Sequence, residues 1–384
     1  MRRPRPQCGL RPLLYAPSVL VYPTIIISAT TPAEIARAAR AACEAIRSGE
    51  PVALPTETVY GLAADALNAT AVARIFEAKE RPFFDPLICH LPSADWVERL
   101  TTSVGPAADQ LVKRLVARFW PGPLTIILPR RADVVPDLVA AGLPTVALRW
   151  SAHPVFRAVI EAFGGPLAAP SANRFGHISP TTGAHALAEL ETRIPLVIDA
   201  GPADHGLEST IVRPLEDGRL EILRPGPITT EVLSEMAEVI NSVNSVSGDD
   251  APIVPGQLGS HYAPRTPLVL HAGHVAIRES ASAGRVGLLA WRADTLTEDL
   301  ARLFASVECL TEHGDARKGA ARLFAAMRRL DDAGLALIVA EPAPNEGLGV
   351  AINDRLTRAG GARAAGTSGD FILKLPRAAK RDLR

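Results

Sequence analysis

Residues 31–61 read TPAEIARAARAACEAIRSGEPVALPTETVYG, which predicts a helix, a strand and a polar loop in succession. The first four residues form a capping box with proline at the first helical position. The apolar residues that follow at helical spacing are Ile35, Ala38, Ala42 and Ile46. Ser48-Gly49 ends this helix, and the apolar run at 52–54 predicts a strand. A helix followed directly by a buried strand is typical of α/β domains.

Short apolar strands recur between helical stretches through the first two thirds of the chain. They are expected at 52–54, 87–89, 124–128, 145–148, 167–169, 196–198 and 210–212. This pattern predicts an α/β domain built on a mixed sheet. A helix is expected at about 230–240, followed by the polar stretch NSVNSVSGDD at 241–250, which is too poor in large apolar residues to join a core.

Beyond this stretch, strands and helices alternate again. Strands are expected at 268–270, 286–290 and 335–339, and helices at 297–305 and 316–330. That alternation predicts a smaller, Rossmann-like βαβ domain with a parallel sheet. Because 384 residues exceed the usual single core, we divide the chain into a disordered leader (1–23), a first domain (24–240), a linker that could act as a lid (241–264) and a C-terminal α/β domain (265–384).

Composition argues against several classes of protein. Lys+Arg and Asp+Glu both number 41, so the zero net charge gives no broad attraction for nucleic acid or anionic membranes. Four cysteines are scattered without a C-x-x-C pair, which disfavours a disulfide framework or structural zinc and favours the cytoplasm. The sequence has no run of about 18 apolar residues, so no membrane span is predicted. The sequence also lacks P-loop, Rossmann G-x-G-x-x-G, G-x-S-x-G and H-E-x-x-H motifs.

Four polar segments follow apolar strands, where open α/β sheets place their ligand sites. They are PTETVYG at 55–61, KERPFFDPLICH at 79–90, PSANRFGHISPTT at 170–182, and EST at 208–210 with RPG at 224–226. Taken singly, each has a plain structural explanation: a capped turn, helix-ending cations with a structural histidine, a capped loop and a surface turn. In the third segment, Ser179-Pro180 is expected to begin a helix, whose N-terminus would attract anions.

Considered together, the segments could bind a triphosphate without a P-loop. Four cations and two hydroxyls are available for its neutralisation: Lys79, Arg81, Arg149, Arg224, Ser171 and Ser179. The sequence therefore supports the hypothesis of an ATP site.

These segments, in this order, resemble the long, two-domain form of the threonylcarbamoyl-AMP synthase family. Lys79-Glu80-Arg81 and Ser171-Ala172-Asn173 are similar to its lysine-x-arginine and serine-x-asparagine signature. Further matches are Phe119-Trp-Pro-Gly-Pro-Leu-Thr125, Asp199-Ala-Gly-Pro202, Glu208-Ser-Thr210, Leu223-Arg-Pro-Gly226, Pro255-Gly256, His261-Tyr-Ala-Pro264 and Gly347-Leu-Gly-Val-Ala-Ile-Asn-Asp-Arg-Leu356. The resemblance spans about residues 30–360 and implies a YrdC-like twisted mixed-sheet domain for 24–240.

The resemblance also implies site residues. The L-threonine pocket would be lined by Thr58, His90, Arg149, Ala169 and Ser209. ATP would be surrounded by Arg81, Asp85, Thr145, Ser171, Asn173, Ser179, Arg224, His261 and Tyr262. Lys79 and Arg81 would be the catalytic cations, and no residue is expected to ligate a metal. The family commonly has asparagine where this chain has Asp85, so a carboxylate would lie near phosphates.

The reaction implied by the resemblance joins L-threonine, bicarbonate and ATP into threonylcarbamoyl-adenylate and pyrophosphate, for modification of the tRNA adenosine next to the anticodon. Mg²⁺ would enter bound to the phosphates of ATP. Further expected partners are tRNA and the downstream threonylcarbamoyl-transfer proteins, and no membrane is expected. Two alternatives remain open: an RNA-binding or ribosome-maturation factor with a basic concave face, and a relative that carbamoylates another acceptor.

Overall fold

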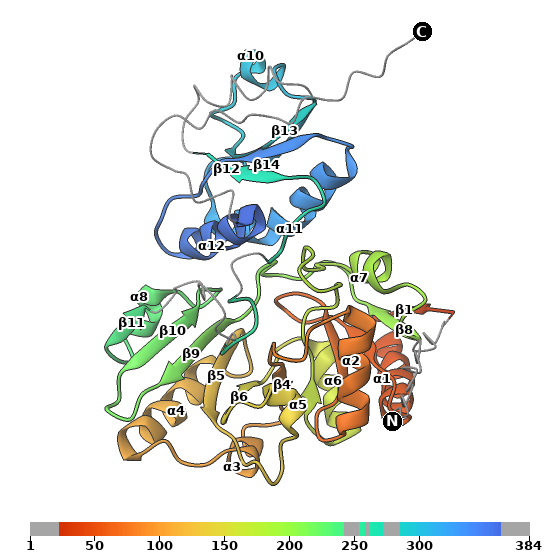
Figure 1. Ribbon diagram of the computed structural model, residues 1–384, viewed down its shortest axis with the longest axis vertical. Coiled ribbons are helices and arrows are strands. Elements are labelled where there is room, and N and C mark those ends of the chain that lie inside the picture. The colour runs from red at the N-terminus through yellow and green to blue at the C-terminus, as the bar shows by residue number, and fades with distance from the viewer. Residues whose placement is uncertain (1–22, 242–252, 258–260, 272–284, 362–384) are drawn as a thin grey trace, which may run out of the picture.

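The computed structural model describes residues 23–241, 253–257, 261–271 and 285–361, and within them the chain forms two sheets. The larger has eleven strands in the order β1-β8-β2-β3-β7-β4-β6-β5-β9-β10-β11, with both parallel and antiparallel neighbours. Its strands are β1 (Ile25–Ser28), β2 (Val52–Leu54), β3 (Gly61–Asp65), β4 (Ile88–His90), β5 (Leu124–Pro129), β6 (Thr145–Arg149), β7 (Leu167–Ala168), β8 (Leu196–Asp199), β9 (Thr210–Pro214), β10 (Leu220–Arg224) and β11 (Val239–Asn241). The smaller sheet lies apart from it (Figure 1).

Eight helices join the strands of the larger sheet among the described residues. They are α1 (Pro32–Arg47), α2 (Ala69–Lys79), α3 (Trp96–Leu100), α4 (Pro106–Phe119), α5 (Asp137–Ala140), α6 (Pro154–Phe163), α7 (Gly183–Leu190) and α8 (Thr230–Ser234). The capping box that opens α1 is present, with Thr31 accepting from the backbone of Glu34 and the Glu34 side chain accepting from the backbone of Thr31. The predicted end of this helix at Ser48 is also correct.

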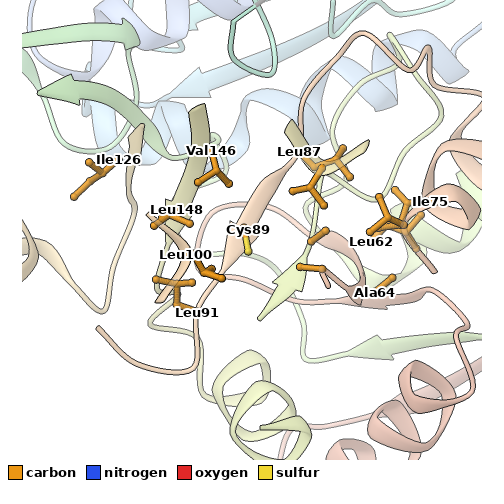
Figure 2. Packing of buried hydrophobic residues seen from close by; sticks show 14 of the residues in the cluster. Leu62, Ala64, Ile75, Leu87, Cys89, Leu91, Leu100, Ile126, Val146 and Leu148 are labelled. Atoms are coloured by element: carbon orange, nitrogen blue, oxygen red, sulfur yellow. The ribbon is translucent and has the colours of Figure 1, made fainter. Parts of the chain in front are cut away.

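Strand alternation distributes side chains between two cores, one on each face of the larger sheet. In β2, Val52 and Leu54 pack with helices α1 and α6, whereas Ala53 points to the other core with α2 and α4. Figure 2 shows the second of these cores, where Leu62, Cys89 and Leu148 come from three different strands. With both faces packed, the strands read as continuous apolar runs, which is why several were predictable.

Helices α1 and α6 cover only part of their face of the larger sheet. Over β4, β5 and β6 the same face is covered differently. Ile88, Ile127 and Ala147 form a small cluster there, and Val254 packs on it from the segment 253–257. This half of the face carries the polar residues described below.

The smaller sheet is parallel, in the order β12-β15-β13-β14. Its strands are β12 (Leu268–Leu270), β13 (Val286–Arg292), β14 (Ser306–Thr311) and β15 (Leu337–Ala340), and its helices are α10 (Glu298–Ala301), α11 (Ala316–Asp332) and α12 (Leu348–Gly360). Helices α11 and α12 lie between this sheet and the larger part of the molecule (Figure 1). Val59, Ile178 and Leu207 from the larger part share one apolar cluster with them.

Several element predictions need correction. The helix expected at 230–240 ends at Ser234, and Val239–Asn241 instead joins the larger sheet as an edge strand beside β10. The helix expected at Ser179-Pro180 begins at Gly183, because Thr182 is its N-cap and accepts from the backbone of His185. Strands β1, β3, β10, β11 and β14 and helices α3, α4, α5, α6 and α12 were not predicted at their residue ranges. The predicted leader, apart from its last residue, and most of the predicted linker lie outside the described residues.

Candidate active site

Three neighbouring strands set a row of polar side chains side by side on one face of the larger sheet. The register pairs His90 of β4 with Arg149 of β6, and Arg149 with Thr125 of β5. The alternate residues Ile88, Ala147 and Ile127 share one apolar cluster, so their i+2 or i−2 neighbours in the row face the same side. This row forms the floor of the site.

Arg149 is fixed by three hydrogen bonds although it is almost fully buried. Its Nη2 donates to Glu57 Oε1 over 2.7 Å, its Nη1 to Thr58 Oγ1 over 2.8 Å, and its Nε to the carbonyl of Gly122 over 3.3 Å. A guanidinium has five N–H groups, so two remain for a ligand once these three bonds are counted. Ser151 Oγ also donates to the Glu57 carboxylate, which holds it against Arg149.

A second arginine organises the neighbouring corner. Arg224, at the end of β10, donates to the carbonyl and the Oγ of Ser209 over 2.9 and 3.1 Å, and its Nη1 donates to the carbonyl of Pro255 over 3.1 Å. Ser209 Oγ lies 2.7 Å from Thr125 Oγ1. The corner therefore joins the floor to the segment that carries Pro255.

The cations at the end of α2 are buried and bonded to backbone. The ammonium of Lys79 donates to the carbonyls of Ser171 and Asn173, which fixes the loop that follows β7. Arg81 donates to the carbonyls of Asp85 and Pro86 over 3.1 and 2.8 Å. Its Nη2 also lies 2.9 Å from Asp85 Oδ2, but the geometry is not that of a hydrogen bond, and neither carboxylate oxygen accepts one from the described residues.

The roof comes from the segment before the smaller sheet. Pro255, Gly256, His261 and Tyr262 line the same cavity as the floor residues. Tyr262 is 1% exposed and stacks on Phe324 of α11 with ring centroids 5.5 Å apart. The His261 ring contacts Tyr262 and Phe175 edge to face.

Ten of the residues predicted for the site line this one cavity. They are Thr58, Arg81, His90, Arg149, Ala169, Ser171, Ser209, Arg224, His261 and Tyr262. Thr58 and Tyr262 are 204 positions apart in the sequence, so distant segments meet at one place, as the hypothesis of a single site required.

Five predicted residues do not line the cavity: Lys79, Asp85, Thr145, Asn173 and Ser179. Lys79 and Asn173 act on the 171–177 loop, since the Asn173 amide donates to the carbonyls of Arg174 and His177. Thr145 begins β6, four residues and about 13 Å along the strand from Arg149. Ser179 donates its hydroxyl to Glu208, so it acts through a side-chain contact rather than through a helix N-terminus.

Burial sets the protonation of the histidines. Burial, with the nearby cation of Arg149, lowers the pKa of His90 to about 3, so the ring is neutral. Burial and the cations of Arg81, Lys79 and Arg224 lower the pKa of His261 well below its usual value. Burial would raise the pKa of Glu57, but Arg149 and Ser151 outweigh it and bring that pKa to about 2. The site therefore combines fixed cations, neutral rings and hydroxyls.

Two carboxylates at this site were not predicted. Glu57 lies in the quoted polar segment 55–61 and holds Arg149, and Glu208 lines the cavity between Ser179 and Arg224. The available signal was that each is the single acid of its segment. A buried arginine requires such a partner.

Comparison with known proteins assigns the chain to a family. The family model of the Sua5, YciO and YrdC proteins, described as "Telomere recombination", matches residues 44–226, and the model "Threonylcarbamoyl-AMP synthase, C-terminal domain" matches 228–361. Threonylcarbamoyl-AMP synthase of Bacillus subtilis is 40% identical over 327 residues, with 83% of this chain and 91% of the relative covered. The chain belongs to the threonylcarbamoyl-AMP synthase family. It is therefore an enzyme.

A second member of the family gives the same picture in structure. The threonylcarbamoyl-AMP synthase of Pyrococcus abyssi is 37% identical over 339 residues, covering 84% of this chain and 94% of the relative. The crystal structure of P. abyssi Sua5 complexed with L-threonine superposes with a TM-score of 0.78 at 36% identity, covering 89% of this chain and 99% of that one. The predicted fold class, a mixed-sheet α/β domain followed by a smaller one, is confirmed.

Within 23–241, 253–257, 261–271 and 285–361, no group of three His, Cys, Asp or Glu side chains is placed to bind a metal ion. Over the same ranges, no helix has the length and apolar character needed to cross a membrane.

Proposed function

We propose that this enzyme condenses L-threonine, bicarbonate and ATP into threonylcarbamoyl-adenylate with release of pyrophosphate. The observation that supports this most directly is the convergence of Arg81, Arg149 and Arg224 on one buried cavity with hydroxyls beside them. Three fixed guanidinium groups can bind a carboxylate at one end and phosphates at the other. The product would serve modification of the tRNA adenosine next to the anticodon.

Arg149 is the group we assign to the threonine carboxylate, because Glu57 and Thr58 fix its plane and leave two N–H donors. Bidentate recognition of a carboxylate requires such a fork. Neutral His90, with Thr58, Ala169 and Ser209, would surround the rest of the amino acid. The L-threonine complex of P. abyssi Sua5 supports this substrate.

Arg81 and Arg224 are the groups we assign to the phosphates, with Ser171, His261 and Tyr262 enclosing the nucleotide. A carbamate, formed from the threonine amine and bicarbonate with loss of water, would attack the α-phosphorus with one carboxylate oxygen. That oxygen forms the new P–O bond. The bond between the α-phosphorus and the oxygen that bridges it to the β-phosphate breaks, and pyrophosphate leaves with that oxygen. The protein would contribute alignment and charge neutralisation, so no enzyme nucleophile is needed.

Mg²⁺ would enter as part of the nucleotide substrate. The cavity offers arginines and hydroxyls rather than a carboxylate cluster, which fits an ion that keeps phosphate oxygens and water as its ligands. When bound, the ion would neutralise charge on the leaving pyrophosphate.

The test is an assay of pyrophosphate release with ATP, Mg²⁺ and bicarbonate, with and without L-threonine. We expect release to depend on threonine, with L-serine as a control that lacks the methyl group. Release that is indifferent to threonine would refute the proposal. An enzyme for another acceptor would give that result, whereas an RNA-binding protein would release no pyrophosphate with or without threonine, which would refute the proposal as well.

A further inference from the structure

A buried arginine of the smaller domain reaches a cavity residue of the larger one. Arg355 of α12 is fully buried, and its Nε donates to Glu208 Oε2 over 2.9 Å. Glu208 lines the cavity and accepts from Ser179 through its other carboxylate oxygen. One carboxylate therefore joins the second domain to a side chain of the first.

The same arginine contacts the roof. The Arg355 guanidinium lies over the ring of Tyr262, 5.4 Å from its centroid, in a cation–π arrangement. Tyr262 has a positive φ of 61°, which a non-glycine residue adopts only when its surroundings hold it there. Arg355 is part of those surroundings.

The next turn of α12 fixes the backbone of the roof. Asp354 accepts from Arg355 Nη1 over 2.7 Å and from Arg358 Nε over 2.9 Å. Arg358 in turn donates to the carbonyl of Gln257 over 2.8 Å, and its own carbonyl accepts from the backbone N–H of His261 over 3.2 Å. Helix α12 therefore contacts the backbone of the roof segment at Gln257 and at His261.

We infer that Arg355 is a positioning residue of the active site, which sets Glu208 and Tyr262 on the nucleotide side of the cavity and so couples the second domain to catalysis. The assignment of this side of the cavity to a nucleotide rests on the proposed function, whereas the contacts of Arg355 do not depend on it. Arg355 is not itself among the residues that line the cavity. It acts through the two that are.

A matched arginine separates this role from simple domain docking. Arg328 of α11 also crosses to the larger domain, where it donates to Glu189 over 3.1 Å and to the carbonyl of Ile178. Neither partner lines the cavity. Loss of either arginine removes a largely buried contact between the domains, but only loss of Arg355 releases cavity residues.

The experiment compares Arg355→Met, Arg328→Met and Tyr262→Ala in the full-length chain, with folding followed by thermal melting. For Arg355→Met we expect the KM for ATP to rise about tenfold, a coupling typical of groups in one network, while the KM for L-threonine changes by less than about twofold. Arg328→Met should lower the melting temperature yet keep both constants. The double variant Arg355→Met/Tyr262→Ala should have a KM for ATP within about twofold of the more impaired single variant, because both changes affect the same ring.

Binding of a non-hydrolysable ATP analogue, measured by calorimetry, gives a readout that does not depend on turnover. Arg355→Met should weaken this binding about tenfold relative to wild type and to Arg328→Met. If Arg355→Met fails to fold, Arg355→Lys, which keeps the charge beside Glu208, should fold and show a smaller loss of the same kind. Wild-type nucleotide binding in a folded Arg355 variant, or equal losses for both arginines, would overturn the inference. A wild-type enzyme without threonine-dependent release would instead refute the proposed function.

Discussion

Arg81 can be tested against Arg174, an arginine that does not line the cavity. Arg81 lines the cavity, whereas Arg174 is partly exposed and contacts Glu189 at 3.4 Å. We expect Arg81→Ala to lower kcat/KM for pyrophosphate release on the order of a hundredfold, about 3 kcal/mol, because it removes a charge that faces the developing negative charge. Arg174→Ala should change it by less than about threefold. Equal, small effects would show that the phosphates bind elsewhere.

Asp85 is the residue at which the resemblance led us to expect asparagine. Its carboxylate is fully buried, and burial raises its pKa although Arg81, Lys79 and Arg224 oppose that shift. Because neither side-chain oxygen accepts a hydrogen bond from the described residues, replacing the carboxylate by an amide takes an acceptor from no donor among them. We expect Asp85→Asn to keep or improve the KM for ATP in the release assay. A loss of activity would mean that the charge itself is required.

Glu57 gives a prediction about stability and pH. Its pKa of about 2 lies below the usual 4.5, because Arg149 and Ser151 outweigh the effect of burial. A lowered carboxylate pKa stabilises the folded state above pH 4.5, and this stabilisation is lost as the pH falls toward 2. Glu57→Gln should therefore lower the free energy of unfolding at pH 7 by on the order of 3 kcal/mol, and the deficit should shrink between pH 4.5 and 2.

Urea unfolding at pH 7 and pH 3 measures this difference. Glu161→Gln is the control, since Glu161 forms an exposed pair with Arg157 one helical turn away and should contribute less than about 0.5 kcal/mol. A deficit for Glu57→Gln that did not depend on pH would mean that packing, rather than charge, holds Arg149.

At this scale, the sequence indicated the cations that line the cavity better than the residues that position them. Arg149 and Arg224 stood out because arginine after a strand suggests an anion site. Glu57 and Arg355 were not predicted, because their importance comes from partners 92 and 147 positions away. Periodicity and spacing carry no information on such pairs.

At the scale of the element, Gly256 decides how closely the roof approaches the cavity. It has a φ of 84°, and a Cβ there would lie 2.5 Å from Tyr262 Oη. We expect Gly256→Ala to displace the Tyr262 ring and raise the KM for ATP several-fold, while the KM for L-threonine stays unchanged. Gly142→Ala is the matched control, because φ is 76° and no atom lies within 4 Å of the added carbon. Both should lose about 1 kcal/mol of stability from the left-handed backbone, and only the first should lose ATP affinity.

The elements that could be predicted were those with a strong local signal. The capping box located α1, and the apolar runs located strands such as β5 and β6. The two edge strands of the larger sheet could not be recognised in this way: β1 exposes Ile25 and Ile26, and β11 exists because Val239–Asn241 pairs with β10. For these, the partner strand supplies the structure, whereas local propensity favoured continuing α8.

At the scale of the molecule, the two domains meet through an apolar contact as well as through ion pairs. Gly206, with a φ of 66°, allows the loop beside Leu207 to touch α11, since a Cβ there would lie 2.5 Å from the Cα of Ala321. Leu207 and Val59 join the core that includes Phe324. The second domain therefore stabilises the loops that bear Thr58 and Glu208, and its removal should affect the site through both stability and geometry.

A truncated chain tests that dependence. It should end after Asn241, since an earlier end would remove β11 from the larger sheet. The two cores of that sheet lie wholly within residues before 241, so we expect the truncated protein to melt cooperatively. Its melting temperature should be lower than that of the full-length chain, because Val59, Ile178 and Leu207 lose their cover.

Threonine-dependent pyrophosphate release should fall in this truncated protein by at least as much as in full-length Tyr262→Ala, because both remove the ring that closes the cavity. Closure matters because a carbamate decomposes and a mixed anhydride hydrolyses when water enters. Product yield per pyrophosphate released, measured by chromatography, should therefore fall together with the rate. A folded truncated chain with full-length rate and yield would mean that the larger domain excludes water unaided, and that α12 and the roof serve another step.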